Sequence, residues 1–186
     1  MKVTVVIPTY NESHNVRQMA EALWALPLAV DILVVDDGSP DGTGALTEQL
    51  VAEHPGRISL LQRGAKLGLG TAYIEGFKHA LAHGADVVVQ MDADFSHGPE
   101  YVPQLVDGLK QYDLVVGSRY VAGGRLDPRW ERGRVWLSAW ANLYARTILG
   151  IRVNDATAGF KAWRQAWWPS LDASRSRWAR GSSACP

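Results

Sequence analysis

The residues of this chain that could do chemistry are carboxylates that directly follow short apolar runs. The clearest case is Asp92-Ala93-Asp94, which comes after the run Val87 to Met91. Two carboxylates separated by one residue offer the hard oxygen ligands that Mg²⁺ or Mn²⁺ prefers, and such an ion takes its other ligands from water and phosphate oxygens. The position of this D-x-D pattern at the end of an apolar run therefore predicts a metal site that serves a diphosphate substrate.

Further acids follow two earlier apolar runs. They are Glu12, after Val3 to Ile7, and Asp36, Asp37 and Asp41, after Ile32 to Val35. Even without Asp41, five carboxylates at one edge of a sheet would repel one another unless a cation or a hydrogen-bonded ligand offset their charge. Helix capping is the competing interpretation, and for Asp41 and Glu100 it is at least as well supported as a functional role.

Short β-branched runs alternate along the chain with stretches of helical periodicity. The runs are Val3 to Ile7, Ile32 to Val35, Ile58 to Leu61, Val87 to Met91 and Leu114 to Val116. This alternation predicts an α/β fold with a mainly parallel sheet flanked by helices. Ligands of such sheets bind beyond the carboxyl ends of the strands, where the acids of this chain fall.

The composition excludes several classes of protein. Of the 186 residues, 47% are apolar and 20% are charged, which is typical of a soluble globular chain. The 19 basic and 19 acidic side chains balance, so the chain lacks the overall basic field of a nucleic-acid-binding protein. The single cysteine, Cys185, has no partner within the chain and fits a reducing compartment. The apolar runs are too short to cross a membrane, and we expect no signal peptide.

Other nucleotide-binding folds lack their motifs here. A dinucleotide fold requires G-x-G-x-x-G after its first strand, where this chain has Pro8 to Glu12. Gly68-Leu69-Gly70 follows the third apolar run instead, and Tyr73 stands where the third glycine would be. A Walker A sequence is absent. The segment Asp36 to Thr43 is only superficially similar to the loop of aspartate-nucleophile phosphatases, which follows their first strand.

Six motifs together resemble the family 2 glycosyltransferases of the GT-A fold. In chain order they are VVIPTYNE, VVDDGSPDGT, KLGLGTAYIEGF, MDADFSH, GSRY and DATAGF. Within that family the combination is most similar to the dolichol-phosphate and polyprenol-phosphate mannosyltransferases. The resemblance covers about residues 2–164, and it depends on the shared order and spacing of the motifs.

The resemblance implies a binding site for GDP-mannose. The residues that would bind its guanosine part are Pro8, Tyr10, Glu12, Val35 and Asp37. Asp92 and Ala93 would contact the nucleotide sugar, and Asp94 would ligate Mg²⁺ or Mn²⁺. Ser96 stands where some relatives have a glutamine as second ligand. Because a serine hydroxyl is a shorter and weaker ligand, we expect water to fill that position.

The resemblance also implies a polyprenyl phosphate acceptor. Arg119 would bind its phosphate together with Arg132 and Arg134, although a solvated helix start explains the last two equally well. A lipid phosphate is already an anionic nucleophile near neutral pH, its second pKa being about 6, so the reaction requires no general base. Asp94 and Arg119 are therefore the expected catalytic residues, and inversion at C1 would give a β-linked mannosyl phosphate.

A polyprenyl acceptor requires contact with a membrane. Trp136, Trp140 and Tyr144 are spaced four residues apart, so they share one face of the helix expected at about 133–149. That face either meets lipid or packs on protein, and the sequence leaves both interpretations open. We expect a cytoplasmic protein, peripheral on the cytoplasmic face of the membrane, held there by its own contacts or by a membrane-anchored partner.

The composition changes after residue 164. The segment Gln165 to Pro186 contains no Val, Ile, Met, Phe, Tyr or Lys. We expect residues 1–164 to form the catalytic domain, incomplete at its C-terminal end, and residues 165–186 to form an atypical, disordered tail. Two alternatives to the mannosyltransferase stay open: a family 2 transferase with another donor such as UDP-glucose, and a truncated nucleotide-binding fragment without activity.

Overall fold

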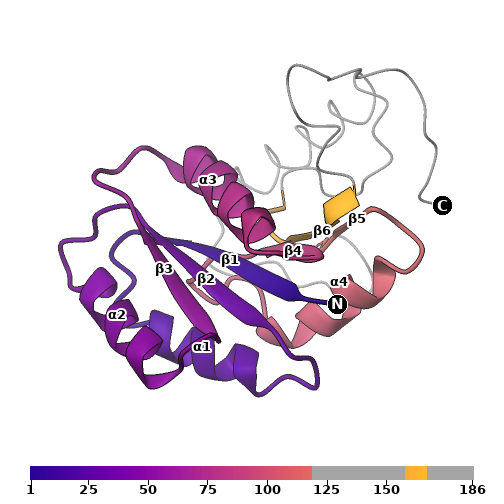
Figure 1. Cartoon of the computed structure of the whole chain (residues 1–186), viewed down its shortest axis with the longest axis horizontal. Helices are drawn as coiled ribbons and strands as arrows, with labels where there is room; N and C mark the ends of the chain where they lie inside the picture. The colour runs from indigo at the N-terminus through magenta and orange to yellow at the C-terminus, as the bar shows by residue number, and fades with distance from the viewer. Residues whose placement is uncertain (119–157, 167–186) are drawn as a thin grey trace, which may run out of the picture.

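A six-stranded sheet forms the centre of the computed structural model, which describes residues 1–118 and 158–166 (Figure 1). The strand order within these residues is β3-β2-β1-β4-β6-β5. The strands are β1 (Val3–Thr9), β2 (Asp31–Asp36), β3 (Ile58–Gln62), β4 (Val87–Gln90), β5 (Leu114–Val116) and β6 (Lys161–Arg164). All five apolar runs that were predicted to be strands are confirmed.

The sheet is mainly parallel, as predicted. Strand β1 pairs in parallel with β2 and β4, and β2 pairs in parallel with β3. Strand β6 runs antiparallel to both of its neighbours, β4 and β5. Strand β6 was not predicted from the sequence, because its four residues contain two cationic side chains and no β-branched one.

Helices cover both faces of the sheet (Figure 1). They are α1 (Val16–Trp24), α2 (Thr43–Glu53), α3 (Leu69–Ala82), the 3₁₀ turn η1 (Pro99–Tyr101) and α4 (Val102–Gly108). Because side chains alternate along a strand, Val5 and Ile7 of β1 join the core under α1 and α4, whereas Val6 joins the core under α3.

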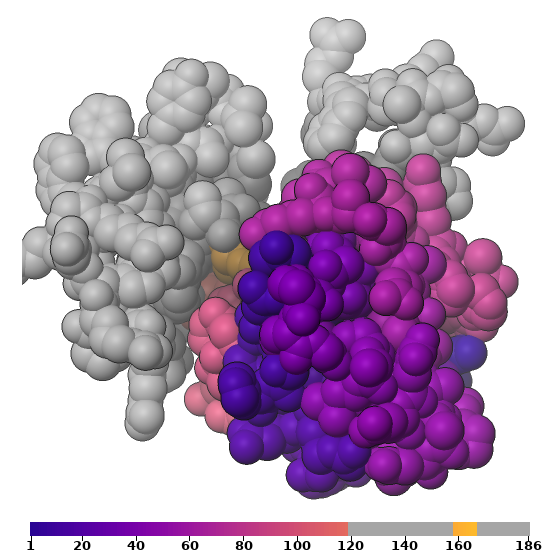
Figure 2. Space-filling model, turned by 90° about the vertical axis from the view of Figure 1, so that its left-hand side faces the viewer, coloured from indigo at the N-terminus to yellow at the C-terminus, as the bar shows by residue number. Residues whose placement is uncertain are grey.

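The carboxyl ends of the parallel strands form one edge of the molecule, which faces the viewer in Figure 2. The segments that follow β1, β2 and β3 lie side by side on this edge, in indigo, purple and magenta. The loop after β4 lies at the same edge, since β4 pairs in parallel with β1. The acids that follow β1, β2 and β4 are therefore brought together.

Helix α3 approaches the sheet closely at Gly76. A Cβ atom at this position would lie 2.5 Å from Cγ1 of Val6 and 2.9 Å from Cγ2 of Val35. Gly70 of the same helix has no such neighbour within 4 Å. The two glycines thus differ in packing while sharing one helix.

We expect Gly76→Ala to lower the free energy of unfolding by about 1–3 kcal/mol, because the added methyl group overpacks the core. The melting temperature should fall by about 2–4 °C for each kcal/mol lost. Gly70→Ala is the matched control, and its melting temperature should be unchanged or higher, since alanine favours helix. Equal melting temperatures for the two variants in scanning calorimetry would contradict this packing argument.

Candidate functional site

The loop after β1 is fixed to the loop after β2 by backbone amides that donate to side chains. Each bond is 3.0 Å long: Asn11 N–H to Ser39 Oγ, Glu12 N–H to Thr43 Oγ1, and Ser13 N–H to Asp41 Oδ2. Burial opposes ionisation of Asp41, but hydrogen bonds from Thr43 and Ser13 outweigh it and hold the pKa of this carboxyl below its ordinary value. The structural interpretation of Asp41 is thereby supported.

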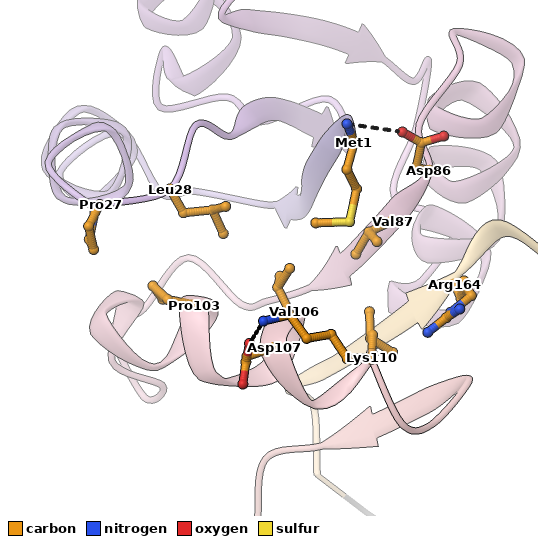
Figure 3. A pocket seen from close by; sticks show the side chains of 11 residues that line it. Met1, Pro27, Leu28, Asp86, Val87, Pro103, Val106, Asp107, Lys110 and Arg164 are labelled. Carbon is orange, nitrogen blue, oxygen red and sulfur yellow. Dashed lines mark ion pairs between the residues drawn. The ribbon is translucent and has the colours of Figure 1, made fainter.

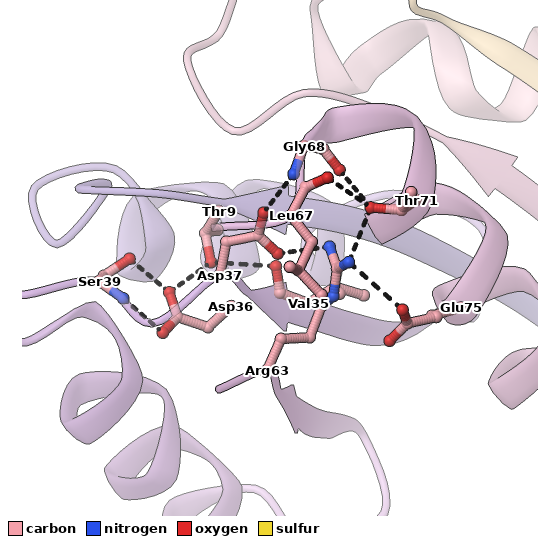
Figure 4. A network of polar contacts seen from close by, with 10 residues as sticks. All are labelled: Thr9, Val35, Asp36, Asp37, Ser39, Arg63, Leu67, Gly68, Thr71 and Glu75. Carbon is pink, nitrogen blue, oxygen red and sulfur yellow. Dashed lines mark hydrogen bonds and ion pairs between the residues drawn. The ribbon is translucent and has the colours of Figure 1, made fainter. Parts of the chain in front are cut away.

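Asp36 and Asp37 are adjacent in sequence but make different contacts (Figure 4). Asp36 is fully buried and accepts hydrogen bonds from the hydroxyls of Thr9 and Ser39, at 3.0 and 2.5 Å. These bonds hold the ends of β1 and β2 together. Asp37 accepts a hydrogen bond of 2.6 Å from Nη1 of Arg63. Asp36 is therefore a structural acid, whereas Asp37 belongs to an ion pair beside a cavity.

That cavity, of about 110 Å³, lies between the ends of β1 and β2 and the start of α3. Its lining is Pro8, Thr9, Tyr10, Asp37, Lys66, Gly68, Leu69 and Ala72. Nζ of Lys66 lies 3.7 Å from the centre of the Tyr10 ring. A cation above an exposed aromatic face, next to a carboxylate, suits a flat polar ligand such as a nucleobase.

Three of the five residues predicted to bind guanosine line this cavity: Pro8, Tyr10 and Asp37. The other two do not line it. The side chain of Val35 is fully buried in the core under α3. The carboxylate of Glu12 accepts a hydrogen bond of 2.7 Å from Nδ2 of Asn15.

A side chain of α3 holds Asp92 in place. The hydroxyl of Tyr73 donates to its Oδ1 at 2.6 Å. Burial and then the charge of Asp92 raise the pKa of Tyr73 far above its ordinary value, so the phenol keeps the proton that it donates. Gly159 packs against the other carboxylate oxygen, since a Cβ atom there would lie 2.8 Å from Oδ2 of Asp92.

Asp94 lies at the exposed tip of the loop after β4. Its Oδ1 accepts a hydrogen bond of 2.9 Å from the backbone N–H of Ser96. The intervening Phe95 has a φ of 57°, in the left-handed region, which turns the chain back on itself. Ala93 is buried between the two aspartates. Asp94 is thus the most accessible acid of the D-x-D pattern.

The donor set fits a divalent cation that is only partly enclosed by protein. Across residues 1–118 and 158–166, no three side chains of His, Cys, Asp or Glu are grouped so that they could hold an ion. Mg²⁺ and Mn²⁺ accept such sites, because one or two carboxylates suffice when phosphate oxygens complete the coordination.

The predicted acceptor residues Arg119, Arg132 and Arg134 lie outside the described residues, as do Trp136, Trp140 and Tyr144. Conversely, Arg63 and Tyr73, which hold Asp37 and Asp92, were not predicted from the sequence to have a role. One signal for Arg63 was available, because it is the first charged residue after the apolar run Ile58 to Leu61. The same criterion had identified the acids.

A larger cavity, of about 610 Å³, lies at the opposite end of the strands (Figure 3). Met1, Val87 and Arg164 line it near the sheet, and Val106 and Lys110 line it from the side of α4. This cavity is remote from the carboxyl edge, and none of the predicted site residues that the structure describes lines it.

Comparisons with known proteins agree with the predicted family. The model of the family "Glycosyl transferase family 2" matches residues 4–168. The polyprenol monophosphomannose synthase of Mycolicibacterium smegmatis is 44% identical over 93% of this chain and 65% of its own length. The undecaprenyl-phosphate mannosyltransferase of Micrococcus luteus is 44% identical over 88% of this chain and 67% of its own length. The chain thus spans about two thirds of the length of these relatives.

A solved structure shows the same architecture. It is the glucosyl-3-phosphoglycerate synthase of Mycobacterium tuberculosis in complex with Mn²⁺, UDP-glucose and glycerol 3-phosphate. It superposes with a TM-score of 0.63 at 25% identity, covering 91% of this chain and 59% of the other. The predicted GT-A fold is confirmed.

We expect Tyr73→Phe to weaken the Mn²⁺-dependent binding of GDP, the nucleotide predicted from the sequence, by about tenfold. A hydrogen bond to a charged group contributes about 1.5–3 kcal/mol, and part of this orients Asp92 for its ligand. Titration calorimetry measures the affinity. Tyr101→Phe, which removes a hydroxyl from an exposed tyrosine, is the control. Equal GDP affinities for the two variants would show that the Tyr73 hydroxyl does not support the site.

Proposed function

Since the chain belongs to glycosyltransferase family 2, we propose that it transfers mannose from GDP-mannose to a polyprenyl phosphate, with inversion at C1. One observation carries this proposal. Strand β1 lies between β2 and β4, so Asp37 directly after β2 and Asp94 after β4 flank the same strand end. A nucleotide base near Asp37 and a diphosphate near Asp94 can then belong to one molecule.

The nucleotide-sugar donor occupies the carboxyl edge in this proposal. Pro8, Tyr10 and Asp37 bind the guanosine part in the small cavity. Glu12 and Val35 complete that part of the site, Val35 through its backbone, because its side chain is buried. Asp92 and Ala93 contact the sugar and diphosphate.

Asp94 holds Mg²⁺ or Mn²⁺ in this proposal, with the hydroxyl of Ser96 or a water as a further ligand. Hard carboxylate oxygens at an accessible loop tip support the assignment. When bound, the cation offsets the negative charge that develops on the departing diphosphate.

The reaction is a displacement at C1 of mannose. The bond between C1 and the diphosphate oxygen breaks, GDP leaves with the electron pair, and an anionic oxygen of the lipid phosphate forms the new bond to C1. This chain needs to position two anions rather than to remove a proton. Arg119 holds the acceptor phosphate with its planar, bidentate guanidinium, and Arg132 and Arg134 assist.

The names of the relatives support the choice of mannose and of a polyprenyl phosphate. A transferase with UDP-glucose as donor is the second candidate, because the similar solved structure holds that nucleotide sugar. Transfer assays with radiolabelled GDP-mannose and UDP-glucose distinguish the two. Binding of GDP-mannose without transfer would instead identify a nucleotide-binding fragment.

The acceptor places the protein at a membrane surface in this proposal, on the cytoplasmic face, through direct contact or through a membrane-anchored partner. No helix in the described part of the chain has the length and apolar character to cross a bilayer. Residues 1–164 form the catalytic domain, and the remainder is the atypical tail. The backbone of Gln165 still donates to the carbonyl of Asp86, at 2.8 Å, so the first residue of that tail contacts the sheet.

We expect Asp94→Asn to lower mannosyl transfer by at least ~100-fold, because the change removes the ligand charge while preserving size, and the metal contributes several kcal/mol. The measurement is the rate of transfer at saturating Mn²⁺. Asp107→Asn is the control, since Asp107 is an exposed acid of α4 paired with Lys110. Unchanged metal-dependent turnover of Asp94→Asn would exclude Asp94 as the ligand.

We expect Arg119→Lys to reduce transfer at least tenfold while changing GDP affinity less than twofold. Lysine keeps the charge but loses the bidentate geometry toward phosphate, and a tenfold loss corresponds to about 1.4 kcal/mol. Initial rates over a range of lipid phosphate concentrations and GDP calorimetry provide the two readouts. A variant with weak GDP binding and normal use of the acceptor would assign Arg119 to the donor side.

A further inference from the structure

Arg63 is a buried cation that follows β3 and reaches the candidate donor site (Figure 4). Its side chain is 3% exposed and that of Asp37 is 7% exposed. Nη1 donates to Oδ1 of Asp37 at 2.6 Å. Nη2 donates to Oγ1 of Thr71 at 2.7 Å and lies 3.3 Å from Oε1 of Glu75. The guanidinium is thus fixed by three side chains.

Stability alone is a poor explanation for this ion pair. Desolvating two charges costs about as much as their attraction returns, and apolar residues of similar volume often serve a fold equally well. The Nε atom of Arg63 is buried and has no hydrogen-bond partner among the described residues, which adds to the cost. The ion pair is better explained if it orients the Asp37 carboxylate for binding a ligand.

The carboxylate of Asp37 is held on both oxygens. Arg63 binds Oδ1, and the backbone N–H of Gly68 donates to Oδ2 at 3.3 Å. Its backbone is fixed as well, because the N–H of Asp37 donates to the carbonyl of Thr9 at 3.0 Å. Asp37 lines the small cavity together with Tyr10. Each oxygen keeps a second lone pair with which it can accept from a ligand.

We propose that Arg63 is a positioning residue that gives the donor site its selectivity for guanine. This inference rests on the proposed function, in which Asp37 binds the guanosine part of the donor. By fixing the plane of the Asp37 carboxylate, Arg63 presents both oxygens to the base. Arg63 itself stays beneath the cavity lining and acts only through Asp37.

The chemistry of the bases explains why orientation matters. Guanine presents two neighbouring donors, the N1–H and the 2-amino group, to a carboxylate that is correctly turned. Hypoxanthine keeps N1–H but lacks the amino group, and uracil presents one N–H between two carbonyl oxygens. A fixed carboxylate thus favours guanine over both, whereas a rotating one loses the advantage of the second bond.

The test compares GDP, IDP and UDP binding to the full chain in Mn²⁺ by titration calorimetry. We expect the unmodified chain to bind GDP at least tenfold more tightly than IDP or UDP. Arg63→Met should reduce the ratio of GDP to IDP affinity to about one or two. Arg63→Lys should restore part of it, since lysine keeps the charge but cannot contact Asp37, Thr71 and Glu75 together. If Arg63→Met does not fold, Arg63→Lys alone carries the test.

Two controls distinguish positioning from a structural role. Arg57→Met removes a guanidinium that lies 5.2 Å from the Trp24 ring, and it should leave all three affinities unchanged. In an Asp37→Asn background, Arg63→Lys should not change the GDP to IDP ratio further. An equal loss for all three nucleotides, or unchanged ratios, would overturn the positioning role and leave the proposed function intact. A preference of the unmodified chain for UDP would overturn the GDP donor and this inference together.

Discussion

The site depends on the parallel pairing of β1 with a neighbour on each side. Because β2 and β4 run in the same direction as β1, the three strands end at one edge, and the loops that follow them must meet there. Asp37 and Asp94 are far apart in sequence, yet this pairing alone makes them parts of one surface. Helix α3 then supplies, from one face of the sheet, the phenol of Tyr73 that holds Asp92 and the side chains that hold Arg63 against Asp37.

Almost every acid at this edge has a different partner that stabilises its negative charge. Hydroxyl groups surround Asp36, Arg63 pairs with Asp37, and the phenol of Tyr73 holds Asp92. The exposed Asp94 receives a backbone N–H. The repulsion expected from the sequence is thus largely offset by partners within the protein, so the stability of this edge does not depend on a bound cation.

Five of the six strands, and the position of the acids at the carboxyl ends of the strands, could be predicted from the sequence, since β-branched runs and the residues after them are local patterns. It did not allow the prediction of the partners. Arg63 lies 26 positions from Asp37, and Tyr73 lies 19 positions from Asp92, so no local period connects them. Strand β6 was missed for a related reason, because its pairing is decided by β4 and β5 rather than by its own side chains.

The place of β6 has a consequence for the order in which the molecule assembles. Strands β1 to β4 can pair with one another once β4 has been synthesised. The second neighbour of β4 is β6, through which β5 also joins the sheet, and β6 comes after residues 117–160. Contacts of such long sequence separation form slowly. During translation the cavity beside Asp37 can therefore form before the segment that contains Gly159 is synthesised and packs against Asp92.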